Sequence, residues 1–438
     1  MPRALRILLL ILSIAAATYA VARIWRDFSQ KAAIDFYLVY VNVHVAGRDD
    51  VPNIYSADAQ STVGEEFFGR SLDSGSRVFH ETASVRRTLD SRGSPFLYAS
   101  FAWISRDFEK ALLHYRVLIL AAFLAGIVLL GRYCRLPLWL TIFLFALLVH
   151  FFLPFRADFT VANVNAIQLF LLALALTLGE RRPMIAGAIL AMMLAAKPNV
   201  VLVVAILMIS RVIARDFRRL GREVVGGAIG GAIAFVVGAL WFETPRIWLL
   251  WLNSAGSLYQ TLLGVEYNNV TPALPLFQQY GTWISYAIAA ALMAIACVPL
   301  LRGAKPDDSL LISLGLLIYF MSATLVWLHY FVLAILPVFA LFRTHGTPAS
   351  SRPDRRLPGG RQDASGPAGW KPALQSTIIA SIALLLMADA PYEMLFGPST
   401  PQLRATLIFI AMLMLFPTCV WLLWRGRGRV PASSVRPA

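Results

Sequence analysis

The sequence predicts an all-α, polytopic membrane protein with about 12 membrane-spanning helices (range about 10–13) and interfacial helices in its first large loop. Two observations support this fold class. Of the 438 residues, 58% are hydrophobic and 14% are charged, whereas soluble domains contain about 25% charged residues. Apolar stretches of membrane-spanning length also recur along the whole chain, and helices satisfy their own backbone hydrogen bonds in lipid.

The predicted spans follow from these apolar stretches. They cover residues 4–22, 112–131, 136–153, 163–179, 183–196, 198–213, 224–241, 283–301, 309–322, 327–342, 374–388 and 404–424. The first stretch resembles a signal peptide, but Arg23 and Arg26 follow it directly. We therefore interpret it as an uncleaved first helix.

The basic residues are distributed asymmetrically across the predicted membrane. With the N-terminus inside, 23 of the 39 Lys and Arg lie on the inner side, against 7 of the 24 Asp and Glu. The outer side holds the other 16 basic and 17 acidic residues. This bias follows the positive-inside rule. The net charge of +15 is therefore explained by topology, with both termini cytoplasmic, and we expect no nucleic-acid partner.

The predicted spans divide the chain into a main membrane domain and a C-terminal part. Residues 1–342 form the main domain, which includes a large outer loop at 23–111. A Pro-, Gly- and Arg-rich stretch at 343–373 is typical of a disordered inner linker. A transmembrane hairpin at 374–424 and a basic cytoplasmic tail at 425–438 follow it.

The large outer loop is expected to contain two short helices. Residues 33–47 are aromatic and half-apolar, which predicts an interfacial helix that ends before Pro52 and Asn53. Residues 61–92 are polar and contain several glycines, so they predict a mobile loop. Residues 94–108 are too short and too polar to span, so they predict a second interfacial or re-entrant helix.

Asp35 is the first candidate for chemistry, because it lies just beyond the first span. A carboxylate in a cleft at the outer face can act as a general base or orient a hydroxyl nucleophile. The alternative is an interfacial acid that balances Lys31 or Arg26.

Lys197 is the second candidate, because ionisable residues within spans are rare and usually functional. Pro198 follows it and disfavours helical geometry at Lys197. The apolar stretch 183–213 is long for one crossing, and basic residues flank both of its ends. We therefore expect a hairpin with Lys197 at its outer tip, where the ammonium could hold a phosphate. The alternative is a lysine that snorkels to the interface.

His329 and Tyr330 lie near the outer end of a late span, where they could contact a phosphate or a sugar. The alternative is that they belong to the aromatic belt beside Trp327.

Four asparagines in outer segments could hydrogen-bond sugar hydroxyls or the acceptor. Asn163 and Asn165 lie where the fourth span begins, and both could face a cavity there or merely cap that helix. Asn268 and Asn269 lie in an outer loop, where their alternative role is turn formation.

Several motifs are absent from the sequence. It contains no DxD pair in the outer loops, no HExxH, no P-loop and no GxGxxG at the start of a Rossmann unit. Asp49 and Asp50 are only a weak metal candidate beside Arg48. None of the three cysteines lies in an outer loop, so we expect no outer disulfide. We predict no cofactor and no metal.

Several segments together resemble the bacterial polyprenyl-phosphate-mannose-dependent mannosyltransferases, which are membrane glycosyltransferases of the C-type fold. The resemblance covers roughly residues 1–345. It rests on IDFYLVY with GRDDVPNIYSAD behind it, VNAIQLFLLALAL, IAGAILAMMLAAKPNVVLVV, GVEYNNVTP and WLHYFVLAILP, in this order and spacing.

The resemblance implies an extracytoplasmic site in the bacterial inner (plasma) membrane, with a lipid-linked sugar that enters from the membrane. It matches Asp35 to the catalytic base. It matches Lys197, Asn268, Asn269, His329 and Tyr330 to the other motif positions. The chain departs from the family at Ala162 and Asn163, where a Gly-Gln pair usually precedes the asparagine of this span.

The expected function is a metal-independent, inverting transfer of a hexose, with mannose favoured, from a polyprenyl phosphate to a lipid or glycan hydroxyl. Membrane lipids are further partners. One alternative is a C-type enzyme for another polyprenyl-linked sugar. A transporter or flippase of lipid-linked sugars is a second, but it should show internal repeats and polar residues at mid-membrane depth. A lipid-binding scaffold is a third, and it would not need Asp35.

Overall fold

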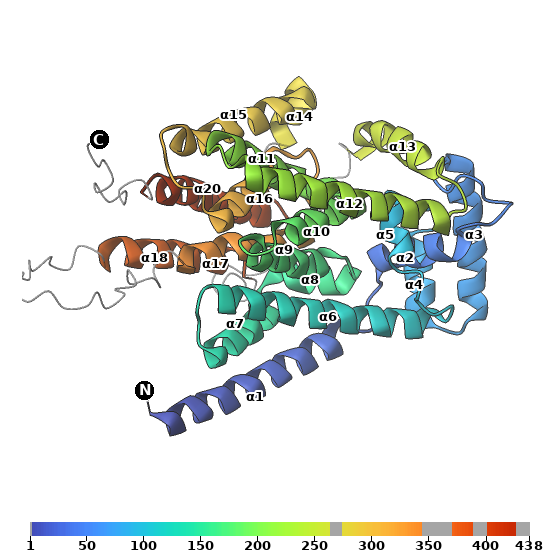
Figure 1. The fold of residues 1–438 in the computed structure, drawn as a ribbon. Coiled ribbons are helices and arrows are strands. Elements are labelled where there is room, and N and C mark those ends of the chain that lie inside the picture. Colours follow the sequence, from blue (N-terminus) through green and yellow to red (C-terminus); the bar gives the residue numbers. More distant parts are fainter. Residues whose placement is uncertain (1, 263–273, 344–369, 389–400, 426–438) are drawn as a thin grey trace, which may run out of the picture.

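The computed structural model describes residues 2–262, 274–343, 370–388 and 401–425. Its regular structure in these ranges consists of helices (Figure 1). A bundle of long helices occupies most of the molecule, and a small group of helices, α2 to α5, covers one end of it. We call this group the cap.

Five helices are long and apolar enough to cross a membrane: α1 (Arg3–Phe28), α6 (Phe108–Tyr133), α12 (Phe217–Trp241), α15 (Trp283–Leu301) and α20 (Pro401–Arg425). The chain bends by 118° between α8 (Leu153–Val161) and α9 (Asn165–Gly179). A sixth span results if these two helices are counted as one broken span. The polytopic helical class is thus supported, while the number of about 12 spans stays a prediction.

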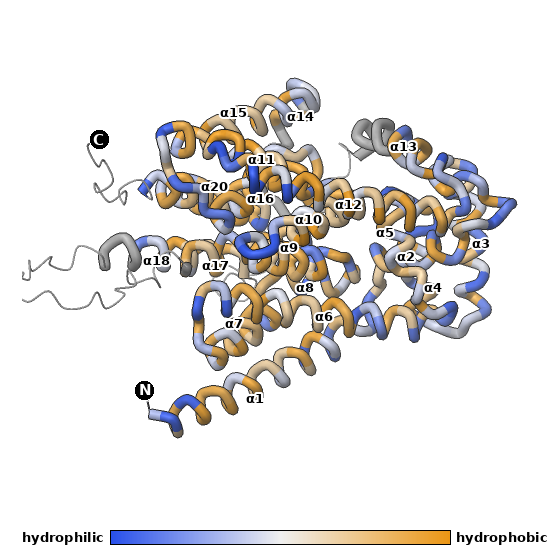
Figure 2. Tube along the Cα trace, viewed as in Figure 1, coloured by the Kyte–Doolittle hydropathy of each residue, from blue (hydrophilic) through white to orange (hydrophobic). Residues whose placement is uncertain are grey.

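The other predicted spans coincide with shorter helices. These are α7 (Leu138–Phe151), α10 (Pro183–Ala196), the 3₁₀ turn η1 (Pro198–Val200) with α11 (Val201–Ile213), α16 (Asp308–Ser322), the 3₁₀ segment η2 (Leu328–Ala334) with α17 (Ile335–Arg343), and α18 (Trp370–Leu386). Two more helices, α13 (Ile247–Leu262) and α14 (Leu274–Tyr280), lie between α12 and α15. Figure 2 shows hydrophobic residues along the bundle, with hydrophilic residues gathered in the cap and in loops at the opposite end.

Glycines bring α10 and α12 into backbone contact. A Cβ added to Gly226 would lie 1.8 Å from the Met184 carbonyl oxygen, and one added to Gly230 would lie 2.3 Å from that of Ala188. Both helices advance by four residues in the same direction between these contacts, so they run parallel. The intervening α11 must therefore return across the bundle, which agrees with the hairpin expected at Pro198. Small residues at such crossings are typical of membrane helices.

The cap corrects the prediction that residues 61–92 form a mobile loop. They contain most of α3 (Ala57–Asp73) and all of α4 (Arg77–Val85). The hydroxyl of Ser76 accepts the Phe79 N–H at 3.2 Å and caps α4. Phe67 and Phe79 are buried in the cap core. The mean hydropathy of this stretch is polar, so it did not reveal the widely spaced apolar residues that form the buried face of each helix.

The first helix of the cap forms as predicted, whereas the last one is shorter than predicted. Helix α2 (Ile34–Val45) forms as expected and ends before Asp49. In the 94–108 stretch only α5 (Pro95–Ala99) is an α-helix, and short turns follow it. The Tyr40 hydroxyl donates to the Arg106 carbonyl at 2.5 Å. Burial raises the pKa of Tyr40 to about 12, so this donor stays protonated near neutral pH.

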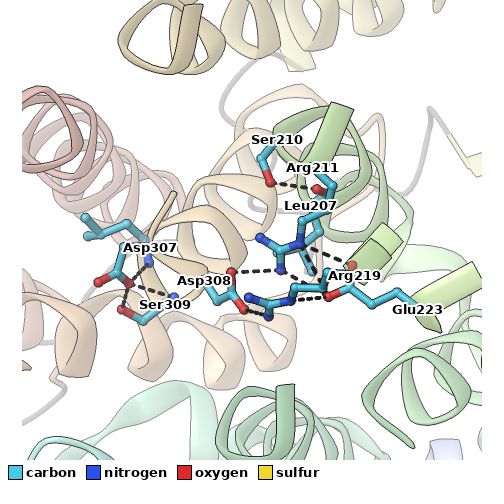
Figure 3. Close-up of polar contacts among 9 residues, drawn as sticks. Leu207, Ser210, Arg211, Arg219, Glu223, Asp307, Asp308 and Ser309 are labelled. Atoms are coloured by element: carbon cyan, nitrogen blue, oxygen red, sulfur yellow. Dashed lines mark hydrogen bonds and ion pairs between the residues drawn. The ribbon is translucent and has the colours of Figure 1, made fainter. Parts of the chain in front are cut away.

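A cluster of four charged residues joins α11, α12 and α16 (Figure 3). We call it the Arg211 cluster. Its two residues on α12 lie near the start of that helix, whereas Gly238 near its end packs against Pro95 of the cap. Arg211 on α11 contacts Asp308 at 2.8 Å and Glu223 on α12 at 3.1 Å. Arg219 contacts the same two carboxylates. The side chain of Arg211 is 2% exposed and joins α12 to α16.

The C-terminal part contains two helices in the described residues, and the predicted transmembrane hairpin stays a prediction. Helices α18 and α20 pack on each other and on α16 and α17. The predicted linker 343–373 and tail 425–438 lie almost entirely outside the described residues.

Candidate functional site

Predicted site residues from four separate segments meet where the cap joins the bundle. We call this the junction site. It consists of Asp35 on α2, Asn163 and Asn165 at the bend between α8 and α9, Lys197 between α10 and η1, and His329 and Tyr330 on η2. Asp35 Oδ2 lies 2.7 Å from Asn163 Nδ2 and 3.5 Å from His329 Nε2. Asn163 contacts Asp35, Lys197 and His329, so the three ionisable residues lie around one side chain.

Asp35 is held at the start of α2 by contacts on both sides of it in the sequence. The backbone N–H of Ala33 donates to the Thr82 hydroxyl of α4 at 3.1 Å. The buried guanidinium of Arg116 donates to the carbonyls of Ser29 and Lys31, in the connection from α1. Since Phe36 and Tyr37 are fully buried, rotation of α2 is resisted and the carboxylate stays at the junction.

The bend between α8 and α9 brings both asparagines to the same place. Ala162 adopts a left-handed conformation with φ of 53°, which non-glycine residues rarely do. Asn163 therefore lies outside α9, and its Oδ1 accepts the Val164 N–H at 2.7 Å. Asn165 begins α9. In a continuous helix the two side chains would diverge, but here both reach Lys197.

Lys197 occupies the extended turn that Pro198 imposes, with φ of −152° and ψ of 114°. Its Nζ donates to Asn163 Oδ1 at 3.1 Å and to Asn165 Oδ1 at 3.0 Å. It also lies 3.9 Å from the centre of the Tyr330 ring. An ammonium has three N–H donors, and the two asparagine oxygens take up two of them.

The orientation of the Asn163 amide follows from its neighbours. An amide nitrogen donates and an amide oxygen accepts. The carboxylate of Asp35 lies on the nitrogen side and the ammonium of Lys197 on the oxygen side. Asn163 thus connects the acid to the cation through one side chain.

Two charged residues of this region escaped the sequence analysis. Asp158 is fully buried on α8, where its carboxylate accepts from Asn165 Nδ2 at 2.8 Å and from the Ala166 N–H at 3.3 Å. Arg86, at the C-terminal end of α4, lies 3.6 Å from Asp35 Oδ1. Both lay in segments interpreted as loops. The only local signal in the sequence was an ionisable residue next to a few apolar ones.

Some candidates stay untested. Asn268 and Asn269 lie outside the described residues. Asp50 pairs with Arg48 at 2.6 Å. Within the described part of the chain, no group of three or more His, Cys, Asp or Glu side chains has the arrangement of a metal site. The metal-independent mechanism stays a prediction.

The arrangement has the elements of acid–base chemistry on an anionic substrate. Asp35 offers a carboxylate with a side-chain exposure of 20%, so a substrate hydroxyl can reach it. Two cations, Arg86 and Lys197, flank the Asp35–Asn163 pair. A carboxylate beside fixed positive charge can accept a proton while a neighbouring leaving group becomes negative.

Comparison with known proteins identifies the family. The model of glycosyltransferase family 87 matches residues 93–327, which is more than half of the chain. No curated protein and no solved structure matches significantly. The matched range contains Asn163, Asn165 and Lys197, whereas Asp35 and His329 lie outside it. The chain therefore belongs to glycosyltransferase family 87, and with its apolar helices it is a membrane glycosyltransferase.

Proposed function

We propose that this protein transfers a hexose from a polyprenyl-phosphate donor to a hydroxyl of a lipid or glycan, with inversion and without a metal. The observation that carries the proposal is the junction site, where one accessible carboxylate lies beside Asn163, Lys197 and His329. Mannose is the first sugar to test, because the sequence resembles mannosyltransferases of this donor class.

In the proposed reaction, Asp35 takes the proton of the acceptor hydroxyl as its oxygen attacks the anomeric carbon. The bond from this carbon to the phosphate oxygen breaks, and the polyprenyl phosphate leaves with the electron pair. Lys197 and His329 stabilise the negative charge that develops on the phosphate. Tyr330 keeps Lys197 in place through its ring.

We propose that Asn163 and Asn165 act mainly by orienting these groups. Their amide oxygens hold Lys197, and the Asn163 nitrogen holds Asp35. Any contact of these two side chains with the sugar uses amide donors and acceptors that are not engaged in these hydrogen bonds. Asn268 and Asn269 stay candidates for the acceptor or the sugar.

The proposed location is the bacterial inner membrane, with both termini cytoplasmic and the junction site on the extracytoplasmic face. The bias of basic residues toward the predicted inner side supports it. A donor with a polyprenyl chain lies in the membrane, so its phosphate can reach a site at the bundle end without a nucleotide-binding domain.

A transfer assay with a chosen set of donors tests this proposal. Membranes that contain the protein are incubated with radiolabelled polyprenyl-phosphate mannose, glucose or arabinose, and the labelled lipid products are separated. We expect a labelled product with wild type and with Asp49→Asn, an exposed acid of the cap, but not with Asp35→Asn. Equal labelling by Asp35→Asn would remove Asp35 as the base. A labelled product from the glucose or arabinose donor, with none from the mannose donor, would exclude mannose as the transferred sugar.

A further inference from the structure

Arg86 differs from the other arginines of the cap that face carboxylates. Arg48, Arg77 and Arg87 each donate a hydrogen bond of 2.6 Å to a carboxylate. Arg86 instead lies 3.6 Å from Asp35 and 3.9 Å from Asp90. Both distances exceed hydrogen-bond length, so the guanidinium is near two acids without binding either closely.

The guanidinium of Arg86 also has a donor with no partner. Its Nε is buried and forms no hydrogen bond in the described part of the chain. A buried donor without a partner costs free energy, and more so on a charged group. Such a group in a native structure calls for an explanation, and a role in catalysis or in binding an ion is one.

The position of Arg86 follows from the docking of α4 on α2. Thr82 accepts the Ala33 N–H, and Arg86 lies one helical turn after Thr82. Asp35 lies two residues after Ala33. The same backbone contact therefore places the acid and the guanidinium side by side. Arg86 is next to Oδ1 of Asp35, while Asn163 and His329 are next to Oδ2.

We infer that Arg86 binds the phosphate of the polyprenyl-linked donor and is a second anion-binding residue of the junction site, besides Lys197. This inference rests on the proposed function. A guanidinium presents planar, paired donors that fit a phosphate, and those of Arg86 are not taken up by close hydrogen bonds. When Asp35 accepts the proton of the acceptor, Arg86 loses the charge of its neighbour. Its attraction then shifts to the phosphate, which gains charge at that moment.

A binding experiment without sugar transfer tests this inference. The purified full-length protein is titrated with a polyprenyl phosphate and, separately, with the matching polyprenol that lacks the phosphate. We expect wild type to prefer the phosphate. Arg86→Gln should bind the phosphate about tenfold more weakly, a change of about 1.4 kcal/mol, and bind the polyprenol unchanged. Arg86→Lys should fall between the two.

Arg87→Gln is the matched control, because Arg87 is the next residue and pairs with Glu65 on the cap surface. It should behave like wild type. The inference is overturned if Arg86→Gln binds the polyprenyl phosphate as tightly as wild type, or if wild type does not distinguish the phosphate from the polyprenol. A lower kcat with unchanged binding would likewise leave Arg86 as a positioning residue for Asp35 only.

The binding result and the transfer assay can fail independently. Loss of phosphate binding in Arg86→Gln, together with no transfer from any polyprenyl-phosphate sugar, would uphold the anion site and reject the proposed transfer. Transfer by wild type with unchanged binding in Arg86→Gln would do the reverse. Melting curves of all variants exclude misfolding as the cause.

Discussion

Two clusters of charged residues lie at opposite ends of the bundle, and they differ in how completely their charges are paired. In the Arg211 cluster, each of the two guanidinium groups contacts both carboxylates (Figure 3). In the junction site, the contacts of Asp35 with Arg86 and His329 are 3.6 and 3.5 Å. Along α12, Glu223 of the Arg211 cluster is about 22 Å from Gly238, which packs against Pro95 of the cap, at 1.5 Å per residue.

The difference distinguishes a structural ion cluster from a candidate binding site. A buried charge is tolerated when opposite charges and hydrogen bonds satisfy it. The Arg211 cluster meets this condition with its own residues, so a ligand would have nothing to add. The junction site leaves a donor of Arg86 without a partner in the described part of the chain, which suits a site for an anionic substrate. Perturbed, incompletely paired charges are more frequent at functional sites.

The largest expected effect is the loss of transfer in Asp35→Asn. Amide substitution keeps the shape of the side chain but removes the base, so we expect a fall in kcat of about 10²–10⁴. The melting temperature should stay near that of wild type. Steady-state kinetics with the active donor, and thermal melting in the same detergent, measure both. A large loss of stability would show that Asp35 is structural, like the Arg211 cluster.

The second effect is on stability and sharpens the contrast. Arg211→Met leaves Glu223 and Asp308 with Arg219 as their only cluster partner, and breaking a buried pair costs about 3–5 kcal/mol. We expect a lower melting temperature and a lower yield of folded protein, with unchanged kinetics per folded molecule. Arg222→Met, on an exposed position of α12, is the control. Equal melting of the two variants would contradict a structural role.

The smallest effect concerns the bend that positions Asn163. Ala162 is fully buried in a left-handed conformation, which costs roughly 1–2 kcal/mol for a residue with a Cβ. Ala162→Gly should raise stability by at most about 1 kcal/mol and keep activity. Ala162→Val should lower both, because a branched side chain resists this conformation. Melting and transfer rates check this, and a stabilised valine variant would speak against the strained bend.

The sequence alone predicted much of the fold, because its signals there are local. Apolar length indicated the spans, and a helix lies at each predicted position. Pro198, together with the basic residues at both ends of the stretch 183–213, indicated a hairpin, which the parallel packing of α10 and α12 supports. The same local signals failed for α3 and α4. Their apolar residues are few and gain meaning only when α2 and α6 bury them.

Single residues of the junction site were also recognisable, because an ionisable group beside or within a membrane span is unusual in itself. Asp35 follows the first predicted span and Lys197 lies within an apolar stretch, so the sequence around each residue was enough to single it out. Asp158 and Arg86 did not, since charged residues in apparent loops are common. Their importance depends on what lies next to them.

The amino-acid sequence by itself determined which segments are apolar helices and which few residues were candidates for chemistry. Only the tertiary structure decided that they form one site. Asp35 and Asn163 are 128 residues apart in the chain, and Asn163 and His329 are 166 apart. Contacts over such separations depend on the docking of the cap, on the bend at Ala162 and on the turn at Lys197 together. The physical reason is that hydropathy and helix propensity act over a few turns, whereas side-chain pairing acts through space.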